Sequence, residues 1–344
     1  MISYLKLFLI SFLITYLCTP IIKRIAIKLG ILDHPKGHKT HAHPTPLLGG
    51  VAIYTGFVLG TLSSLDYNQA LKGILVASTI ILFLGLIDDI RHLPASTRLF
   101  GQIIASLILV IHGIRIDFFH NFYLNVFATV FGIVGITNAL NFLDNMDGLA
   151  AGLAAMCSLS IFAIAYQTRQ SWLSYLALAL AASCLAFLRY NFKPAKIFMG
   201  DSGSTFLGFT IAGLAVMGEW SYHLPVTITL PTLIFGVLIF DTTLITVLRI
   251  KEGKVRNFRQ WIEHADTDHF SHRLVNLGLS QRQAVLVIYF CNLALGIVAI
   301  LIPKESSLIA LLAFSVFLLI VVFGILGLDK AKINGFKLGR RYIK

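Results

Sequence analysis

Clusters of Asp and Asn interrupt the apolar segments of this sequence, and their oxygen atoms could bind a metal ion or exchange protons. The densest cluster has two Asn and two Asp at intervals of three residues: Asn138, Asn141, Asp144 and Asp147. On a continuing helix, this spacing would align the four side chains along one face. Ionisable groups beside apolar segments are costly and generally mark a functional site. Asp147 is also suited to cap a helix that begins at residue 148.

Three further Asp residues lie at the ends of apolar segments. Asp88 and Asp89 close one segment, where adjacent carboxylates repel each other and the helix dipole disfavours their charge. Arg91 would neutralise them at a solvated helix end, whereas clustered carboxylates without a matching Lys favour a divalent cation or a proton-transfer role. Asp201 lies among small residues that let backbone N–H groups approach a phosphate. It could bind the accompanying metal or act as an N-cap.

Cationic and His side chains accumulate farther along the chain. His269, His272 and Arg273 could bind a diphosphate through charged hydrogen bonds, although attraction to anionic lipid headgroups would also explain the arginines of this segment. The His pair lacks a Cys or a third ordered ligand, which argues against a zinc site. Asp241, about two helical turns before the end of its apolar segment, is expected to face the same region.

A second basic segment contains Lys39 and His41 and leads into a Pro-Thr-Pro corner and the pair Gly49-Gly50. It could bring a basic loop to the same face, although Pro and Gly also form a rigid turn before a helix. The Gly-Lys-Ser/Thr signature of a P-loop does not occur in the sequence, which argues against a nucleotide hydrolase of that class.

Composition places these residues in a membrane protein. The chain has 344 residues, of which 57% are hydrophobic and only 13% charged, with long uncharged runs. With about 20 apolar residues per span, the sequence predicts an all-α, polytopic integral membrane protein with a single domain over residues 1–344. The eleven predicted spans lie near residues 4–22, 47–64, 71–88, 99–114, 123–137, 148–167, 171–188, 203–217, 225–247, 283–303 and 307–328.

The distribution of charge predicts the topology. One of the two alternating sets of loops holds 23 of the 28 Lys and Arg residues, and the positive-inside rule makes that set cytoplasmic, with the N-terminus outside and the C-terminus inside. This topology explains the net charge of +12, and nucleic-acid binding is not predicted. The four Cys residues lack the spacing of a disulfide framework or a zinc site. The predicted cytoplasmic segments lie near 23–46, 88–98, 137–147, 189–202 and 248–282, with a basic tail over 329–344.

Every polar cluster falls on the predicted cytoplasmic side. A transporter would more naturally place its polar groups near the membrane midplane, on broken helices within repeated halves, and the sequence shows no internal repeat. The distribution therefore predicts an enzyme that works at the inner face on one water-soluble substrate and one lipid.

These segments resemble those of the polyprenyl-phosphate N-acetylhexosamine-1-phosphate transferases, integral membrane enzymes that begin cell-envelope glycan assembly. The last motif resembles the N-acetylglucosamine-1-phosphate branch more than the muramoyl-pentapeptide translocases. Three positions depart from the family pattern. Ser271 occupies the third position of the usual His-x-His-His motif, Asn145 stands where Gly is common, and Leu47 stands where many members have Arg. The resemblance covers most of the chain, through motifs at 33–50, 85–89, 138–152, 191–204, 240–249 and 268–285.

The resemblance implies transfer of N-acetylhexosamine 1-phosphate, expected to be GlcNAc 1-phosphate, from a UDP-sugar to undecaprenyl phosphate. The products would be a lipid-linked diphosphosugar and UMP, and the reaction would initiate synthesis of a surface glycan such as an O-antigen or teichoic acid. The location implied is the cytoplasmic (inner) membrane of a bacterium, the cofactor is Mg²⁺ or Mn²⁺, and the family suggests a homodimer. Phosphoryl transfer needs charge neutralisation and alignment, which metal, Arg and His supply.

By motif position, the resemblance also implies roles for individual residues. Asp201 is the expected metal ligand, assisted by Asp89 or Asn141. Asp88 is expected to accept the proton of the lipid phosphate or otherwise ready it for attack. Phe198 is expected to stack on uracil.

The remaining acidic pair, Asp144 and Asp147, is expected to position the sugar, the metal or the lipid phosphate. Direct attack and a covalent aspartyl step both remain open. The other expected substrate-binding residues are Lys39, His41, Asn138, Lys196, Asp241, His269, His272 and Arg273.

Three alternative functions remain. The same chemistry could use UDP-MurNAc-pentapeptide or another UDP-sugar as the donor. A transporter of a nucleotide sugar or a polyprenyl lipid would instead move intact ligand and release no UMP. An intramembrane aspartyl protease fits less well, because it needs two carboxylates that share a proton inside the bilayer, whereas this chain spreads its carboxylates along the interface.

Overall fold

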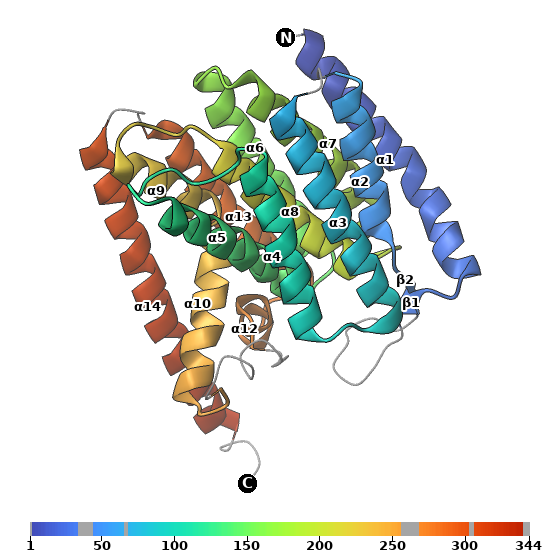
Figure 1. The fold of residues 1–344 in the computed structure, drawn as a ribbon. Coiled ribbons are helices and arrows are strands. Elements are labelled where there is room, and N and C mark those ends of the chain that lie inside the picture. Colours follow the sequence, from blue (N-terminus) through green and yellow to red (C-terminus); the bar gives the residue numbers. More distant parts are fainter. Residues whose placement is uncertain (1, 34–43, 65–67, 256–267, 303–305, 340–344) are drawn as a thin grey trace.

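The computed structural model describes residues 2–33, 44–64, 68–255, 268–302 and 306–339, and they form a bundle of helices (Figure 1). The short strands β1 (Leu32–Asp33) and β2 (Thr45–Pro46) pair antiparallel, with Asp33 opposite Thr45. The helices are α1 (Ile2–Lys28), α2 (Gly49–Leu62), α3 (Gln69–Arg91), α4 (Ala95–Ile111), α5 (Phe122–Leu143), α6 (Leu149–Gln167), α7 (Ser171–Asn191), α8 (Gly200–Met217), α9 (Leu224–Ile234), α10 (Gly236–Lys251), α12 (Phe270–Asn276), α13 (Gln281–Leu301) and α14 (Ser307–Gly339).

Each of the eleven predicted spans coincides with a helix, and the ninth coincides with a pair of helices. Within the described ranges, seven helices are long and apolar enough to cross a membrane, or up to eight if α9 and α10 form one broken span. These two helices meet at an angle of 77° around Phe235, so the continuous helix expected over 225–247 is wrong. The helices α2 and α4 are apolar but shorter than 18 residues. The count of eleven spans and the orientation in the membrane stay predictions.

Among the seven candidate spans of the described residues, α6 and α7 are the most buried, with 72% of their most apolar part buried, whereas α14 has only 17% and α1 22%. Both central helices are rich in Ala, and small residues let helices approach closely where lipid provides no hydrophobic driving force. Figure 1 shows α1 and α14 at opposite edges of the bundle. The apolar side chains exposed on these outer helices are suited to contact lipid tails.

The start of α8 is held between α2 and α3 by glycines. A Cβ atom at Gly50 would lie 2.4 Å from the Cα of Gly203, and one at Gly85 would lie 2.4 Å from the Cα of Ser202. The amides of Gly49 and Gly50 donate to the carbonyls that precede α8, each at 3.0 Å. Glycines at these positions therefore permit contact between backbones, which a larger residue would prevent.

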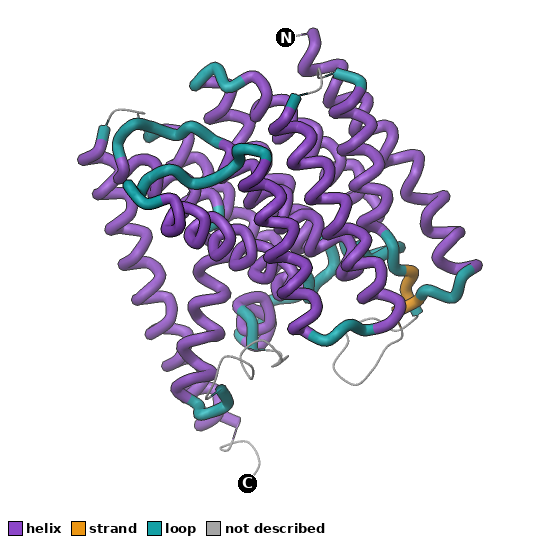
Figure 2. Tube along the Cα trace, viewed as in Figure 1, coloured by secondary structure: helices purple, strands orange, loops and turns teal. Residues whose placement is uncertain are grey.

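The segments that carry the polar motifs gather at one end of the bundle. Figures 1 and 2 show the two strands, the short helix α12 and the connection from α3 to α4 at this end. The turn from α5 to α6 and the loop from α7 to α8 are joined here by hydrogen bonds between Asp147 and Ala195 and between Gly148 and Asn191. The bundle thus brings residues far apart in the sequence into one region.

Candidate active site

Asp89 anchors the first turn of α8. Its two carboxylate oxygens accept hydrogen bonds from the backbone amides of Asp201 at 2.7 Å and Ser202 at 3.1 Å. These amides belong to the helix start, where N–H groups have no partner within the helix and favour a negative charge. Gly200 has φ of 73°, and a Cβ there would lie 2.5 Å from Asp89 Oδ2. Both oxygens of Asp89 are therefore engaged by the backbone of the helix that carries Asp201.

Asp201 is the second residue of α8 and not its N-cap, which is Met199 without a side-chain cap. Its Oδ1 accepts a hydrogen bond of 2.8 Å from Asn141 Nδ2, which also donates to Ser204 Oγ at 2.8 Å. With the amide nitrogen so placed, Asn141 Oδ1 points away from these partners. Within the described ranges, neither Asn141 Oδ1 nor Asp201 Oδ2 has a hydrogen-bond partner.

Asp88 forms an ion pair with Arg98. The side chain of Asp88 is 3% exposed, and its oxygens accept from the amide of Leu93 at 2.6 Å and from Arg98 Nη1 at 3.0 Å. The same Arg98 nitrogen lies 4.0 Å from Asp201 Oδ1. Arg91, the partner considered from the sequence, is not the cation that pairs with Asp88. Arg98 is a site residue that the sequence motifs did not predict. Its position at the start of the helix that follows the acidic pair is the feature that could have indicated it.

The four Asn and Asp residues spaced by three do not share one helix face, because α5 ends at Leu143. Asn138 donates to Gln102 Oε1 at 2.7 Å and joins α5 to α4. Asp144 is the C-cap of α5, and Asp147 lies in the following turn. The predicted alignment over a continuing helix is therefore wrong for the two acidic residues.

Asp147 and its neighbour connect the α5–α6 turn to the α7–α8 loop. The amide of Ala195 donates to Asp147 Oδ2 at 3.0 Å, and the amide of Gly148 donates to Asn191 Oδ1 at 3.1 Å. The N-cap of α6 is Gly148, with φ of 81°, so the expectation that Asp147 caps this helix is wrong. The carboxylate instead satisfies a loop amide.

Asp144 is half-buried and its carboxylate makes no hydrogen bond or ion pair with any residue that the structure describes. Burial and, to a smaller extent, the nearby charges of Asp201, Asp89 and Asp147 together raise the pKa of Asp144 to about 8. An unpartnered carboxyl group with a pKa near neutrality can exchange protons or bind a cation that compensates its charge.

A second group of polar residues joins α10 to α12. The fully buried Asp241 accepts from His269 Nδ1 at 2.8 Å and from the amide of Phe270 at 2.7 Å. Asp241 is thus placed to orient the His269 ring, with Nε2 on the side opposite the carboxylate. Arg249, which is 2% exposed, forms a bidentate pair with Asp268 at 2.9 and 2.6 Å.

The other cationic groups of this segment are Arg273 and His272. Arg273 donates from Nε to the carbonyl of Asp268 at 2.8 Å. Burial and the neighbouring His269 lower the pKa of His272, while Asp241 and Asp268 oppose this shift. His272 can therefore accept a hydrogen bond in its neutral form, whereas Arg273 stays cationic.

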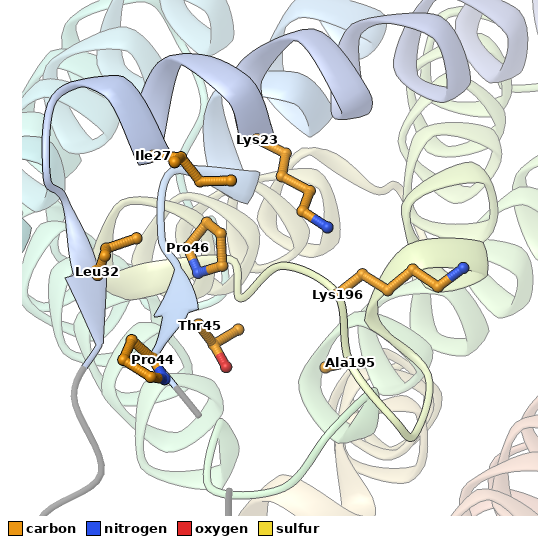
Figure 3. A pocket seen from close by; sticks show the side chains of 8 residues that line it. All are labelled: Lys23, Ile27, Leu32, Pro44, Thr45, Pro46, Ala195 and Lys196. Carbon is orange, nitrogen blue, oxygen red and sulfur yellow. The ribbon is translucent and has the colours of Figure 1, made fainter. Parts of the chain in front are cut away.

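Lys196 lines a cavity of about 430 Å³ beside the loop from α7 to α8 (Figure 3). The other lining residues include Lys23 near the end of α1 and the Thr45-Pro46 strand. Phe198 follows in the same loop, and its amide donates to the carbonyl of Pro46 at 2.8 Å. Lys39 and His41 lie outside the described residues.

The acidic site is rich in oxygen donors, which suit hard divalent cations. In the parts of the chain that the structure covers, no three His, Cys, Asp or Glu side chains converge to form a complete metal site. Mg²⁺ commonly binds to one or two carboxylates and completes its coordination with substrate phosphate and water. The free oxygens of Asp144, Asp201 and Asn141 fit such a partial site, while the oxygens of Asp89 are already used.

Comparison with known proteins identifies relatives of this chain. The sequence model of glycosyl transferase family 4 matches residues 71–219. A Bacillus subtilis protein named probable undecaprenyl-phosphate N-acetylglucosaminyl 1-phosphate transferase is 39% identical over 100% of this chain and 98% of its own length. Mycobacterium tuberculosis decaprenyl-phosphate N-acetylglucosaminephosphotransferase is 32% identical over 83% of this chain and 78% of its own length.

A more distant relative supports the same relationship. Escherichia coli undecaprenyl-phosphate alpha-N-acetylglucosaminyl 1-phosphate transferase is 25% identical over 84% of this chain and 81% of its own length. The similarity thus extends over nearly the whole set of helices that forms the site, and the apolar helices agree with a multi-pass bacterial membrane protein. The chain is an enzyme of the phosphotransferase class and belongs to glycosyl transferase family 4.

Proposed function

We propose that this enzyme transfers GlcNAc 1-phosphate from UDP-GlcNAc to undecaprenyl phosphate, with release of UMP. The observation that carries the proposal is the relative that is 39% identical over the full chain and is named for this acceptor and this sugar. The acidic and cationic groups at one end of the bundle support it, because the reaction joins a diphosphate donor to a phosphate acceptor. The product is a lipid-linked diphosphosugar that begins synthesis of a surface polysaccharide.

A divalent cation, Mg²⁺ or Mn²⁺, would neutralise charge on the transferred phosphoryl group when it is bound. Asp201 and Asp144 are the proposed carboxylate ligands, with Asn141 Oδ1 as a neutral donor. Asn141 Nδ2 and the first turn of α8 hold Asp201 in place. Asp89 contributes by fixing that first turn, and the sequence-based expectation of Asp89 as a ligand is less well supported by its hydrogen bonds.

The acceptor phosphate must lose its proton before it attacks the donor. The sequence favours Asp88 for this step, but Asp88 is buried and paired with Arg98. Asp144 has no partner in the described chain and a pKa raised to about 8, so its ionised form, whose fraction grows as the pH approaches 8, is the better-suited proton acceptor while no cation is bound. We therefore assign Asp88 and Arg98 to charge balance beside Asp201, where Arg98 can also approach a phosphate oxygen.

The donor diphosphate is proposed to lie against the cationic segment before and within α12. Asp241 fixes His269 through Nδ1, which leaves Nε2 available to the donor. Arg273 supplies a lasting positive charge, and His272 can donate or accept a hydrogen bond according to its protonation. Phe198 remains the proposed stacking partner of uracil, and Lys196 a phosphate ligand at the loop from α7 to α8.

The decisive experiment measures UMP release by detergent-purified protein given undecaprenyl phosphate, Mg²⁺ and a panel of UDP-sugars. We expect UMP from UDP-GlcNAc only when lipid and metal are both present, and loss of that UMP in Asp201→Asn. UMP from another donor, such as UDP-MurNAc-pentapeptide, would replace GlcNAc in the proposal. Movement of intact nucleotide sugar across vesicles without UMP would instead establish a transporter.

The orientation and assembly of the enzyme complete the proposal. The polar end of the bundle is placed at the cytoplasmic face of the inner membrane, where UDP-sugars are available, and the protein is proposed to act as a homodimer. Accessibility of a single Cys introduced in the turn near Asn145, tested from each side of sealed vesicles, checks the orientation. Labelling only from the side that corresponds to the outer face of the inner membrane would contradict this orientation.

A further inference from the structure

Ser271 and Asn145 form a hydrogen bond between two segments that carry the reactive groups. The Ser271 hydroxyl in the first turn of α12 donates to Asn145 Oδ1 at 2.8 Å, in the turn between α5 and α6. Ser271 is fully buried and Asn145 half-buried. Both residues depart from the family pattern that the sequence resembles, and the structure places the two departures in contact.

The hydrogen bond has a defined direction. Asn145 Nδ2 donates to the carbonyl of Phe142 at 3.2 Å, and a carbonyl oxygen can only accept. The amide nitrogen must therefore face Phe142, which leaves the amide oxygen facing Ser271 and makes the hydroxyl the donor. Both polar ends of the Asn145 side chain are used, so the pair defines one relative position of the two segments.

The pair joins the acidic and the cationic parts of the site. Asp144 directly precedes Asn145 in the turn, while His272 and Arg273 directly follow Ser271. The helix α12 has only seven residues, and helices of this length are not stable in isolation. Its position therefore depends on its contacts with the rest of the protein.

Other contacts hold this segment through α10, α13 and α5: α12 packs against α13, and the His269 ring lies 6.4 Å from the ring of Phe142 at the end of α5. Asp241 binds His269 and the amide of Phe270 from α10, and Arg249, also on α10, binds Asp268. The Asn145–Ser271 hydrogen bond supplies the contact with the α5–α6 turn. The packing with α13 and the Phe142 ring is apolar and less directional than a hydrogen bond, so loss of the Asn145–Ser271 bond would allow the segment to shift relative to Asp144.

We propose that Asn145 and Ser271 are positioning residues that hold the His269–Arg273 segment against the Asp144 turn and thereby set the affinity for the donor diphosphate. The identity of that donor rests on the proposed function. Because the polar groups of the pair engage each other and the backbone of Phe142, the pair acts through the neighbouring His, Arg and Asp side chains. The acceptor lipid does not depend on this cationic segment in the proposed arrangement.

The test is a double-mutant cycle with Ser271→Ala, Asn145→Ala and the double variant. We expect each single variant to raise the KM for UDP-GlcNAc about 3- to 10-fold, the range expected for loss of one neutral hydrogen bond. The double variant should show no larger rise than Asn145→Ala alone, because the bond that Ser271→Ala removes is already absent in Asn145→Ala. The kcat and the KM for undecaprenyl phosphate should change less than about twofold. Ser271→Thr, which keeps the hydroxyl, should restore the donor KM.

Hydrogen exchange at the amides of α12 supplies a readout that does not need the donor. Ser271→Ala should exchange faster there than the wild type, and the control Ser183→Ala, which removes another fully buried hydroxyl from α7, should not. Unchanged exchange in Ser271→Ala, additive effects in the double variant, or equal rises in both KM values would each overturn the proposal. Absence of UMP from every UDP-sugar with wild-type protein would refute the proposed function, while the exchange measurement would still decide the positioning role.

Discussion

Asp89 and Asp144 are both acidic residues of the site, but their surroundings predict opposite effects of the same substitution on stability. Asp89 accepts two backbone hydrogen bonds at the start of α8, whereas Asp144 has no side-chain partner within the described residues. Replacement of each by Asn removes a negative charge with almost no change in volume. The pair of variants therefore separates a residue that supports the structure from one that acts in the reaction.

Asp89→Asn should destabilise the protein because the amide can accept only one of the two hydrogen bonds. Its NH₂ group would face a backbone N–H group, which leaves that donor without a partner. A buried donor left without a partner costs about 1–3 kcal/mol. We therefore expect a loss of about 1–3 kcal/mol, concentrated in the first turn of α8. Displacement of Asp201 by even about 1 Å should then reduce kcat by about 100-fold.

Asp144→Asn should reduce kcat by about 100- to 10,000-fold through loss of a proton acceptor or ligand, without loss of stability. The pKa of Asp144 in the folded state is raised to about 8 from an ordinary value of 3.8. The folded state therefore binds more protons than the unfolded state between these values, and wild-type stability falls as the pH rises through this window. The variant lacks this fall, so it should be at least as stable as the wild type, most clearly above pH 8.

The assay combines thermal unfolding of the detergent-purified proteins at pH 6 and pH 9 with UMP release. Asp117→Asn is the matched control. Asp117 lies in the loop between α4 and α5, away from the acidic site, and accepts a hydrogen bond from Asn125 of α5. The control should keep its activity. The reasoning is refuted if Asp144→Asn lowers the unfolding temperature as much as Asp89→Asn does, or if Asp89→Asn leaves it unchanged.

Three further predictions follow from the geometry of the site. Gly200→Ala should lower the free energy of unfolding by at least about 1 kcal/mol, because an L-residue at φ of 73° is strained and its Cβ would lie 2.5 Å from Asp89. A variant as stable and active as the wild type in thermal unfolding and UMP release would contradict this packing. The affinity for Mn²⁺, measured by paramagnetic resonance, should rise by up to about tenfold per pH unit as the pH increases toward 8, and then level off, because the cation must displace the proton of Asp144. An affinity that does not depend on pH would exclude Asp144 as a ligand. Arg98→Lys should retain more activity than Arg98→Met, since Lys keeps a charge beside Asp88, and equal UMP release by the two variants would show that this charge is dispensable.

The membrane class, the places of the helices and the acidic clusters follow from the sequence, because they depend on local properties. A run of about 20 apolar residues predicts a span wherever the rest of the chain lies, and carboxylates beside such runs stand out by their cost. The motifs near Asp88, Asn141 and Asp201 were recognisable for the same reason, and the comparisons confirm the family that they resemble.

The hydrogen-bond partners within the site were decided only by the packing of the helices. Asp88 pairs with Arg98 on the next helix and not with the nearer Arg91, because the turn between α3 and α4 folds the chain back. Asp89 holds the start of α8, more than one hundred residues away, through contacts that spacing cannot reveal. The end of α5 at Leu143 likewise separates Asp144 from the helix face predicted for it.

The same limit applies to the roles of individual carboxylates. In the sequence, Asp88, Asp89, Asp144 and Asp201 are four similar acids at the ends of apolar segments. The fold gives one of them an Arg, one a pair of backbone amides and one an Asn, and it leaves Asp144 without a partner among the described residues. Charge and residue type are properties of the sequence, but burial and hydrogen-bond satisfaction exist only once distant segments are packed together.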